Sequence, residues 1–116
     1  MKALVVDDSR AMRMILGRLL KGLGFEVTEA GNGQEAVEIV RAAGPFDLAL
    51  VDWNMPVMNG LEFVQAVRMD RGLDPMRIMM VTTETQPEQL IQALEAGASE
   101  YLMKPASVEL NQRIVL

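Results

Sequence analysis

The sequence predicts an α/β fold with three layers, in which helices cover both faces of a five-stranded parallel sheet. Short apolar runs of strand length alternate with amphipathic stretches of helix length along all 116 residues, and this alternation is typical of repeated βα units. The runs Ala3 to Val6 and Leu48 to Val51 contain only apolar residues, so these strands should be buried on both faces. Such a doubly wound sheet reverses its strand order, and ligands bind beside that reversal at the carboxyl ends of the strands.

Five rounds of strand and helix can be placed along the chain. The expected strands are Lys2 to Val6, Glu26 to Ala30, Phe46 to Val51, Arg77 to Val81 and Glu100 to Met103. The expected helices run from Ser9 to Leu23, Gly33 to Ala43, Gly60 to about Asp70, Pro87 to Gly97 and Ser107 to Leu116. Glycines that follow helices, such as Gly24, and Pro87 in a first turn mark these boundaries.

Two of the expected helices carry a clear apolar face. In the first helix the apolar positions recur at helical spacing, at Met12, Ile15, Leu16, Leu19, Leu20 and Leu23. In the second helix Ala36, Val37, Val40 and Ala43 are expected to point inward. Both patterns are typical of helices that pack one side on a sheet.

The composition excludes several kinds of function. There is no Cys and no His, so disulfides, zinc sites built on thiolates or imidazoles, and thiol nucleophiles are ruled out. A net charge of −5 argues against binding to a nucleic-acid backbone. No segment approaches the roughly 18 apolar residues that a membrane span requires. We therefore expect one domain, 1–116, that is soluble and cytoplasmic.

Polar residues follow four of the expected strands. Asp7 and Asp8 follow the first, Asp52 the third and Thr82 the fourth, and Lys104 ends the fifth. These side chains should converge at one edge of the sheet. Carboxylates 4 Å apart repel each other by about 4 kcal/mol per pair at an effective dielectric constant near 20, so positive charge is required among them.

A divalent cation and Lys104 are the candidates for that positive charge. Oxygen ligands of this kind favour Mg²⁺, and Mn²⁺ could substitute for it. The simpler alternative is that Asp8 or Ser9 only caps the first helix. Capping accounts for one acidic residue, whereas the pattern contains three acidic residues and a lysine.

The ordered set of motifs resembles a known family. The motifs are Leu4-Val5-Val6-Asp7-Asp8-Ser9, Asp52-Trp53-Asn54-Met55-Pro56, Asn59-Gly60, Met80-Val81-Thr82-Thr83-Glu84, and Gly97 through Lys104-Pro105. Together they resemble the receiver domains of two-component response regulators, and among those the stand-alone chemotaxis regulators of the CheY type. The resemblance implies a flavodoxin-like (βα)5 fold with strand order 2-1-3-4-5.

The resemblance also implies a role for each residue of the acidic site. Asp52 would be the phosphoacceptor, which takes a phosphoryl group from the phosphohistidine of a partner histidine kinase. Asp7, Asp8, Asp52 and the backbone carbonyl of Asn54 would hold Mg²⁺. Lys104 would neutralise the phosphoryl oxygens. A carboxylate with an ordinary pKa near 3.9 is already ionised at neutral pH, so this chemistry needs no histidine base.

Further positions match the switch and the lifetime determinants of the family. Thr82 and Tyr101 resemble its switch pair, in which the hydroxyl moves onto the phosphoryl group and the aromatic ring turns inward. Asn54 and Glu84 occupy positions that tune the lifetime of the acyl phosphate. Ala106 departs from the family, which commonly has an aromatic residue there, and the fifth helix is short. Both departures lie on the surface that the family uses to bind partners, which is formed by the fourth helix, the fifth strand and the fifth helix.

The expected function is therefore that of a signalling switch. We expect no enzyme activity beyond self-phosphorylation from a phosphodonor and slow hydrolysis of the acyl phosphate. The expected partners are a histidine kinase and an output protein, with a flagellar motor switch protein as one candidate, and the chain is expected to be a monomer. The alternatives are a Mg²⁺-dependent aspartyl-phosphate phosphohydrolase, a flavin-binding module, and a non-phosphorylated interaction domain of the same fold.

Overall fold

A computed structural model describes residues 1–44, 46–70, 76–83, 86–104 and 114. Its strands are β1 (Lys2–Val6), β2 (Glu26–Ala30), β3 (Leu48–Val51), β4 (Arg77–Thr82) and β5 (Glu100–Met103). Its helices are α1 (Arg10–Gly22), α2 (Gly33–Ala43), α3 (Gly60–Arg68) and α4 (Pro87–Ala96). The strands form one sheet in the order β2-β1-β3-β4-β5, which confirms the predicted fold and strand order.

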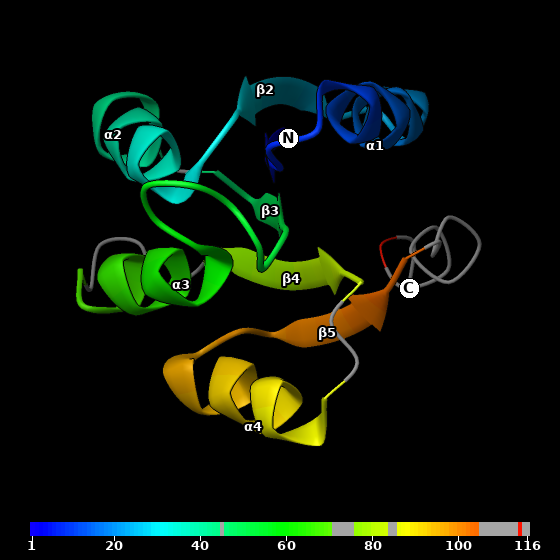
Figure 1. Cartoon of the computed structure of the whole chain (residues 1–116). Helices are drawn as coiled ribbons and strands as arrows, with labels where there is room; N and C mark the ends of the chain where they lie inside the picture. The colour runs from blue at the N-terminus through cyan, green and yellow to red at the C-terminus, as the bar shows by residue number, and fades with distance from the viewer. Residues whose placement is uncertain (45, 71–75, 84–85, 105–113, 115–116) are drawn as a thin grey trace.

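Helices cover the sheet on both faces, as Figure 1 shows. On one face the alternate strand residues Leu4, Val6, Ala49 and Val51 belong to the core that packs under α2, α3 and α4. On the other face Ala3, Val5, Leu48 and Leu50 pack with Leu16 and Leu20 of α1. The β1 and β3 residues in these clusters are at most 2% exposed, so the predicted burial of both strand faces is confirmed.

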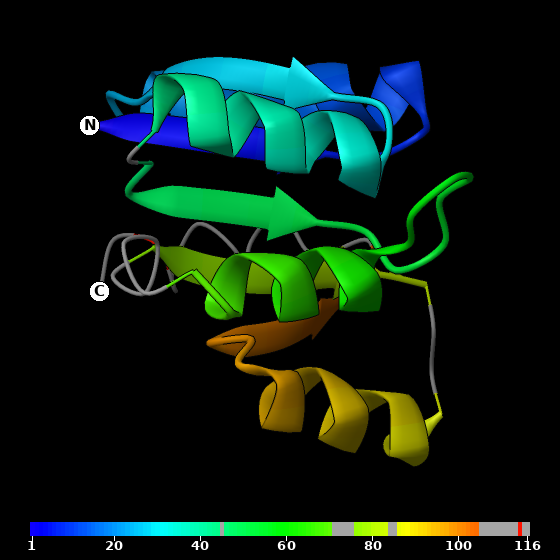
Figure 2. The same ribbon diagram turned by 90° about the vertical axis from the view of Figure 1, so that its left-hand side faces the viewer.

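All strands are parallel, and their carboxyl ends lie on one side of the molecule (Figure 2). Val6, the last residue of β1, is in register with Ala30 of β2 and Val51 of β3. The order reverses at β1, because the chain passes from β1 out to β2 and then returns across β1 to β3. The segments that follow β1 and β3 therefore begin side by side at the reversal, where such sheets bind ligands.

The helix ends follow the predicted signals. Ser9 caps α1 by accepting a hydrogen bond from Met12 N at 3.2 Å. Asn59 and Glu62 form a reciprocal capping box at the start of α3, an arrangement that satisfies two otherwise unpaired amides. Gly97 ends α4 with a φ of +114°, a conformation that glycine adopts without strain.

Two inward-facing positions were predicted wrongly. Ile15 is 56% exposed, because α1 instead turns Gly17 toward the sheet, where the glycine lies close to Val27 of β2. Ala43 is exposed as the last residue of α2, at an edge where the Lys2 ammonium donates a hydrogen bond to its carbonyl oxygen.

Several predicted boundaries also differ from the structure, by one or two residues each. Phe46 lies before β3 rather than in it, and is buried in the core with the Lys2 ammonium 4.6 Å from its ring centroid. Thr82 is the last residue of β4, and α3 ends at Arg68. The predicted helix Ser107 to Leu116 lies outside the described residues except for Ile114, which packs against the α1 side of the core.

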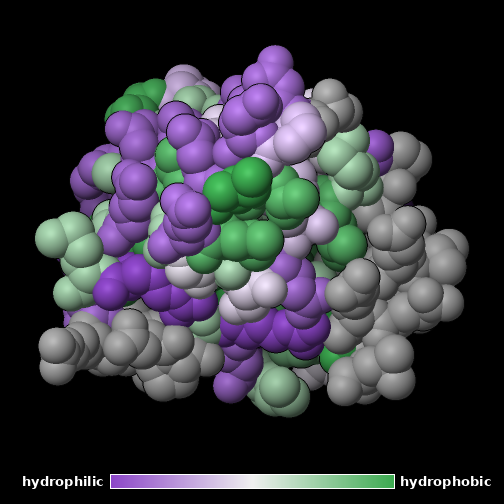
Figure 3. Space-filling model, turned by 90° about the horizontal axis from the view of Figure 1, so that it is seen from below, coloured by the Kyte–Doolittle hydropathy of each residue, from purple (hydrophilic) through white to green (hydrophobic). Residues whose placement is uncertain are grey.

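The surface of α4 carries exposed apolar side chains. Leu90, Ile91 and Leu94 are 38–53% exposed, and Figure 3 shows apolar side chains gathered on the side of the molecule that α4 covers, surrounded by polar ones. None of the helices in the described part of the chain has the length and apolar content needed to cross a bilayer.

Candidate functional site

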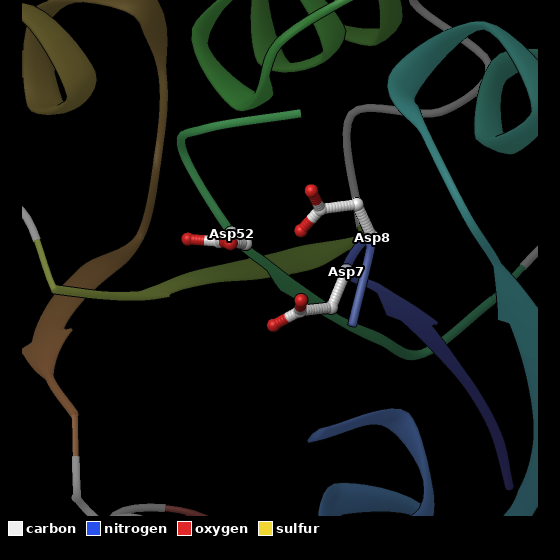
Figure 4. A group of neighbouring side chains, drawn as sticks. All are labelled: Asp7, Asp8 and Asp52. Atoms are coloured by element: carbon white, nitrogen blue, oxygen red, sulfur yellow. The ribbon is translucent and has the colours of Figure 1, made fainter. Parts of the chain in front are cut away.

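Three carboxylates meet at the reversal of the sheet (Figure 4). Asp7 and Asp8 follow β1, and Asp52 follows β3. One carboxylate oxygen from each lies within 4.8 Å of the others. The main chain holds Asp52 next to the end of β1, because Asp52 N donates to the Val6 carbonyl at 2.9 Å and so continues the pairing of β1 with β3. The predicted convergence of the three aspartates is confirmed.

Lys104 brings a positive charge to the same place. Its Nζ atom lies 2.7 Å from Asp7 Oδ2 and 3.5 Å from Asp52 Oδ2. The Lys104 amide donates to the Thr82 carbonyl at 2.9 Å, so the pairing of β4 with β5 positions the lysine. Its side chain is 13% exposed. The ammonium thus neutralises part of the acidic charge where water screens little of it.

Asp7 is a buried and fully engaged carboxylate. It is 1% exposed, and its Oδ1 atom accepts a hydrogen bond from Ser9 N at 2.9 Å while Oδ2 faces Lys104. Ser9 is also the helix cap, so the alternative in which Asp8 serves as the cap is wrong. Asp8 is instead exposed. Its carboxylate is therefore available to a ligand.

Asp52 is 8% exposed and accepts a hydrogen bond from the Trp53 amide at its Oδ1 atom, at 2.8 Å. Burial raises the pKa of Asp52 above its ordinary value of 3.8, and repulsion from Asp7 raises it further. Lys104 and hydrogen bonds from the Thr82 side chain and the Trp53 amide oppose this rise in the pKa. The ionised form of Asp52 is thus held in an unfavourable environment that a further cation would relieve.

The oxygen atoms of this cluster fit a small divalent cation. An octahedral Mg²⁺ ion binds oxygens at about 2.1 Å, which places adjacent ligands about 3.0 Å apart and opposite ligands about 4.2 Å apart. One carboxylate oxygen from each of Asp7, Asp8 and Asp52 lies within 4.8 Å of the others. Modest side-chain rotations would bring these oxygens into that range. The donor set is oxygen only, as Mg²⁺ prefers.

The remaining predicted residues lie around this cluster. Thr82 is fully buried at the end of β4, and Tyr101 lies in β5 with its ring partly buried against the core. The register pairs Met80 with Tyr101 and Thr82 with Met103, so Thr82 and Tyr101 project from one face of the sheet. Asn54 is exposed, two residues beyond Asp52. Glu84 and Ala106 lie outside the described residues.

Sequence reasoning missed several groups that hold the site together. The amides of Ser9 and Trp53 fix Asp7 and Asp52, but backbone donors carry no signal in residue type. Arg13 donates from Nη1 to the Asp7 carbonyl at 2.7 Å. The sequence shows only that Arg13 is a cationic residue one helical turn beyond the cap. On that information it cannot be distinguished from an ordinary solvated arginine.

Comparison with known proteins identifies the family. Residues 3–115 match the response regulator receiver domain. The chain belongs to this family. The receiver is 41% identical to the chemotaxis protein CheY of Pseudomonas aeruginosa over 111 residues, covering 95% of this chain and 89% of that protein. It is 46% identical to the chemotaxis protein CheY1 of Helicobacter pylori over 106 residues, covering 90% and 86%.

Solved structures agree with this assignment. The chemotaxis response regulator CheY4 of Vibrio cholerae superposes with a TM-score of 0.87 at 39% identity, covering 97% of each chain. The chain is thus a CheY-type phosphoaccepting receiver of two-component chemotaxis signalling, and a signalling protein rather than a classical enzyme. A histidine kinase phosphodonor and a downstream partner follow from membership in the family. The phosphohydrolase, flavin and interaction-domain alternatives are set aside.

Proposed function

We propose that Asp52 is the residue that accepts the phosphoryl group. A carboxylate oxygen of Asp52 attacks the phosphorus of a phosphohistidine, the P–N bond breaks, and the imidazole leaves with the electron pair and takes up a proton. The observation that carries this proposal is that Asp52 lies buried between Asp7 and Lys104, with Thr82 in hydrogen-bonding contact. Such a site is suited to stabilising charge that develops on a transferring phosphoryl group.

The residues around Asp52 have separate roles in neutralising the charge of the phosphoryl group. Asp7, Asp8, Asp52 and the backbone carbonyl of Asn54 would hold Mg²⁺, or Mn²⁺ in its place, and the bound cation supplies charge neutralisation at the phosphoryl oxygens. Lys104 lies 3.5 Å from Asp52 Oδ2, close enough to bind a second phosphoryl oxygen after a small shift. Asp7 keeps Lys104 in place through their 2.7 Å ion pair.

Thr82 and Tyr101 form the proposed switch. The Thr82 side chain already hydrogen-bonds Asp52, so a new phosphoryl oxygen on Asp52 would draw the hydroxyl toward it. Tyr101 projects from the same face of the sheet and would turn into the space that Thr82 leaves. We further assign Asn54 and Glu84 to the lifetime of the acyl phosphate, since both follow the ends of strands that border the site.

The output surface is proposed to be the face of α4 and β5, together with the residues that follow them. Its support is the exposure of the apolar side chains Leu90, Ile91 and Leu94 on α4 and of Met103 on β5, which is 40% exposed. Tyr101 lies in β5, so a rotation of its side chain would change the shape of this face directly. A flagellar motor switch protein is the proposed partner, in line with the chemotaxis relatives.

We infer that residues 1–116 work as a single receiver domain and as a monomer. The phosphodonor would be a histidine kinase that uses ATP, which places the reaction in the cytoplasm.

Trp53 provides a direct test, because it is the only tryptophan and its amide binds Asp52. We expect Mg²⁺ to change its fluorescence, and acetyl phosphate to produce a further change that requires Mg²⁺. Asp52→Asn should remove the second change. Asp47→Asn is the matched control, because Asp47 lies at the opposite end of β3. A donor response that persists in Asp52→Asn would contradict the assignment of the acceptor.

A further inference from the structure

Arg13 connects three elements at the edge of the acidic site. It lies in the second turn of α1, and its Nη1 atom donates to the backbone carbonyl of Asp7 at 2.7 Å. Its Nε atom donates to Glu29 Oε1 of β2 at 3.0 Å. The side chain is 19% exposed, so most of its length is packed. Because the guanidinium is planar and binds two partners at once, its position is well defined.

The contact from Arg13 completes the fixation of Asp7. The Asp7 amide donates to the Ala30 carbonyl at 3.1 Å. Its two carboxylate oxygens are bound by the Ser9 amide and by Lys104. The carbonyl is the remaining polar group of Asp7, and Arg13 binds it. The carbonyl belongs to the peptide unit that joins Asp7 to Asp8, so Arg13 sets the orientation of that peptide plane.

The position of the Asp8 carboxylate depends on the orientation of this peptide plane more than the position of the Asp7 carboxylate does. The Asp8 side chain is exposed, and no hydrogen bond or ion pair to it is present among the residues that the structure describes. Its carboxylate nevertheless lies within 4.8 Å of those of Asp7 and Asp52. Since the described residues supply no hydrogen bond or ion pair to hold it there, the direction in which Asp8 leaves the main chain determines whether it reaches the cluster.

We propose that Arg13 is a positioning residue for the divalent cation, which it never touches. It acts by holding the Asp7–Asp8 peptide in the orientation that directs Asp8 toward Asp7 and Asp52. Glu29 supports it by binding the other edge of the guanidinium. This inference rests on the proposed cation site, and it adds a residue on α1 and one on β2 to the three acidic ligands.

The sign of the effect separates positioning from simple electrostatics. Arg13 is a cation beside an anionic site, so its charge alone repels Mg²⁺, and removal of that charge should strengthen binding. Loss of positioning should weaken binding instead. A purely structural role would lower the stability of the fold and leave the Mg²⁺ affinity unchanged at temperatures well below unfolding.

The experiment is a Mg²⁺ titration followed by Trp53 fluorescence, without any phosphodonor, on the full chain. We expect Arg13→Met to weaken Mg²⁺ binding about 10-fold, the lower end of the range for groups that orient metal ligands. Arg13→Lys should recover part of the affinity, because an ammonium can bind one of the two partners. Arg18→Met is the matched control, since Arg18 is an exposed arginine of the same helix, and should leave affinity unchanged.

Glu29→Gln gives a second and milder perturbation. Its side chain is 46% exposed, so the fold tolerates the change, and far-ultraviolet circular dichroism verifies this for every variant. We expect a smaller weakening in the same direction. Equal or tighter Mg²⁺ binding in Arg13→Met would overturn this inference and leave the proposed cation site standing. Glu29→Gln removes an acidic charge and should weaken binding on electrostatic grounds as well, so the sign of the effect is read from Arg13→Met. A wild-type protein that does not respond to Mg²⁺ would overturn the proposed cation site and this inference with it.

Discussion

The α-carbon of Gly60 lies against the backbone carbonyl of Asp52, so closely that a β-carbon at residue 60 would be 2.1 Å from the Asp52 oxygen. Gly60 is the first residue of α3, and its amide donates to the Trp53 carbonyl at 2.9 Å. The loop that leaves Asp52 therefore returns directly onto Asp52. This contact couples the start of α3 to the position of the proposed phosphoacceptor.

Gly60→Ala should accordingly disturb both the fold and the site. We expect the free energy of unfolding to fall by about 3 kcal/mol, the upper end of the usual cost of overpacking, since a backbone atom must move. Urea unfolding measures this loss, and acetyl phosphate labelling should slow in the same variant. Gly22→Ala is the control, because apart from its chain neighbours and the backbone of its own helix nothing lies within 4 Å of the added methyl group. Equal stabilities for the two variants would show that the close contact is not present in solution.

Asp52→Asn should stabilise the protein when no divalent cation is present. Burial and repulsion from Asp7 raise the pKa of Asp52 above 3.8 in the folded state, so folding disfavours its ionised form. The resulting cost is fully present above the raised pKa, declines as the pH falls through it, and is absent below 3.8. The stability advantage of Asp52→Asn should follow the same course.

Urea unfolding in EDTA at several pH values measures this advantage. Addition of Mg²⁺ at neutral pH should reduce it, since the cation stabilises the wild-type carboxylates. Glu95→Gln, a change at an exposed carboxylate of α4, serves as the control. An Asp52→Asn variant that is less stable than the wild type at neutral pH in EDTA would contradict the electrostatic description of the site.

Lys104→Met should leave two buried carboxylates without their shared cation. Asp7 is 1% exposed and Asp52 8%, so we expect a loss of about 3 kcal/mol in EDTA, as for other broken buried ion pairs. Mg²⁺ should restore part of this stability and should bind more tightly than to the wild type, because the ammonium no longer competes. Phosphoryl transfer should nevertheless be slower. Calorimetry with and without Mg²⁺ tests this, with the exposed Lys21→Met as reference; unchanged stability in EDTA would refute the ion-pair assignment.

Val57 carries backbone strain in the loop between β3 and α3. Its φ is +69°, its side chain is 81% exposed, and Met58 N donates to the Pro56 carbonyl at 2.7 Å around it. Positive φ is unfavourable for a β-branched residue, whereas asparagine tolerates it. Val57→Asn should therefore raise the free energy of unfolding by about 1 kcal/mol. Val57→Ile keeps the β-branch and should give no gain; a gain in both variants would point to a cause other than strain.

Most of the fold and the acidic site follow from local patterns. The alternation of strand and helix lengths, together with caps such as Asn59, placed the elements within a few residues. The convergence of Asp7, Asp52 and Lys104 followed because parallel strands end at one edge. These predictions needed only the residue types and their order.

Features that depend on how elements rotate or contact each other were not predictable. Ile15 fits the apolar stripe of α1, but Gly17, about 200° further around the helix axis, is the residue that the packing on Val27 buries. The sequence has no signal for a glycine that packs inward in this way. Likewise, Val57 has no preference for positive φ, and only the path of the loop imposes it. The contact of Arg13 with a backbone carbonyl requires the three-dimensional structure.

Chemical mapping of the phosphorylated residue tests the central claim most directly. Incubation with Mg²⁺ and acetyl phosphate, followed by borohydride, reduces an acyl phosphate of aspartate to homoserine, which peptide mass spectrometry locates in the sequence. We predict homoserine at position 52, dependent on Mg²⁺, with Asp7 and Asp8 unchanged. Homoserine at position 7 or 8 in place of 52, or no modified residue at all, would contradict the assignment of Asp52 as the phosphoacceptor.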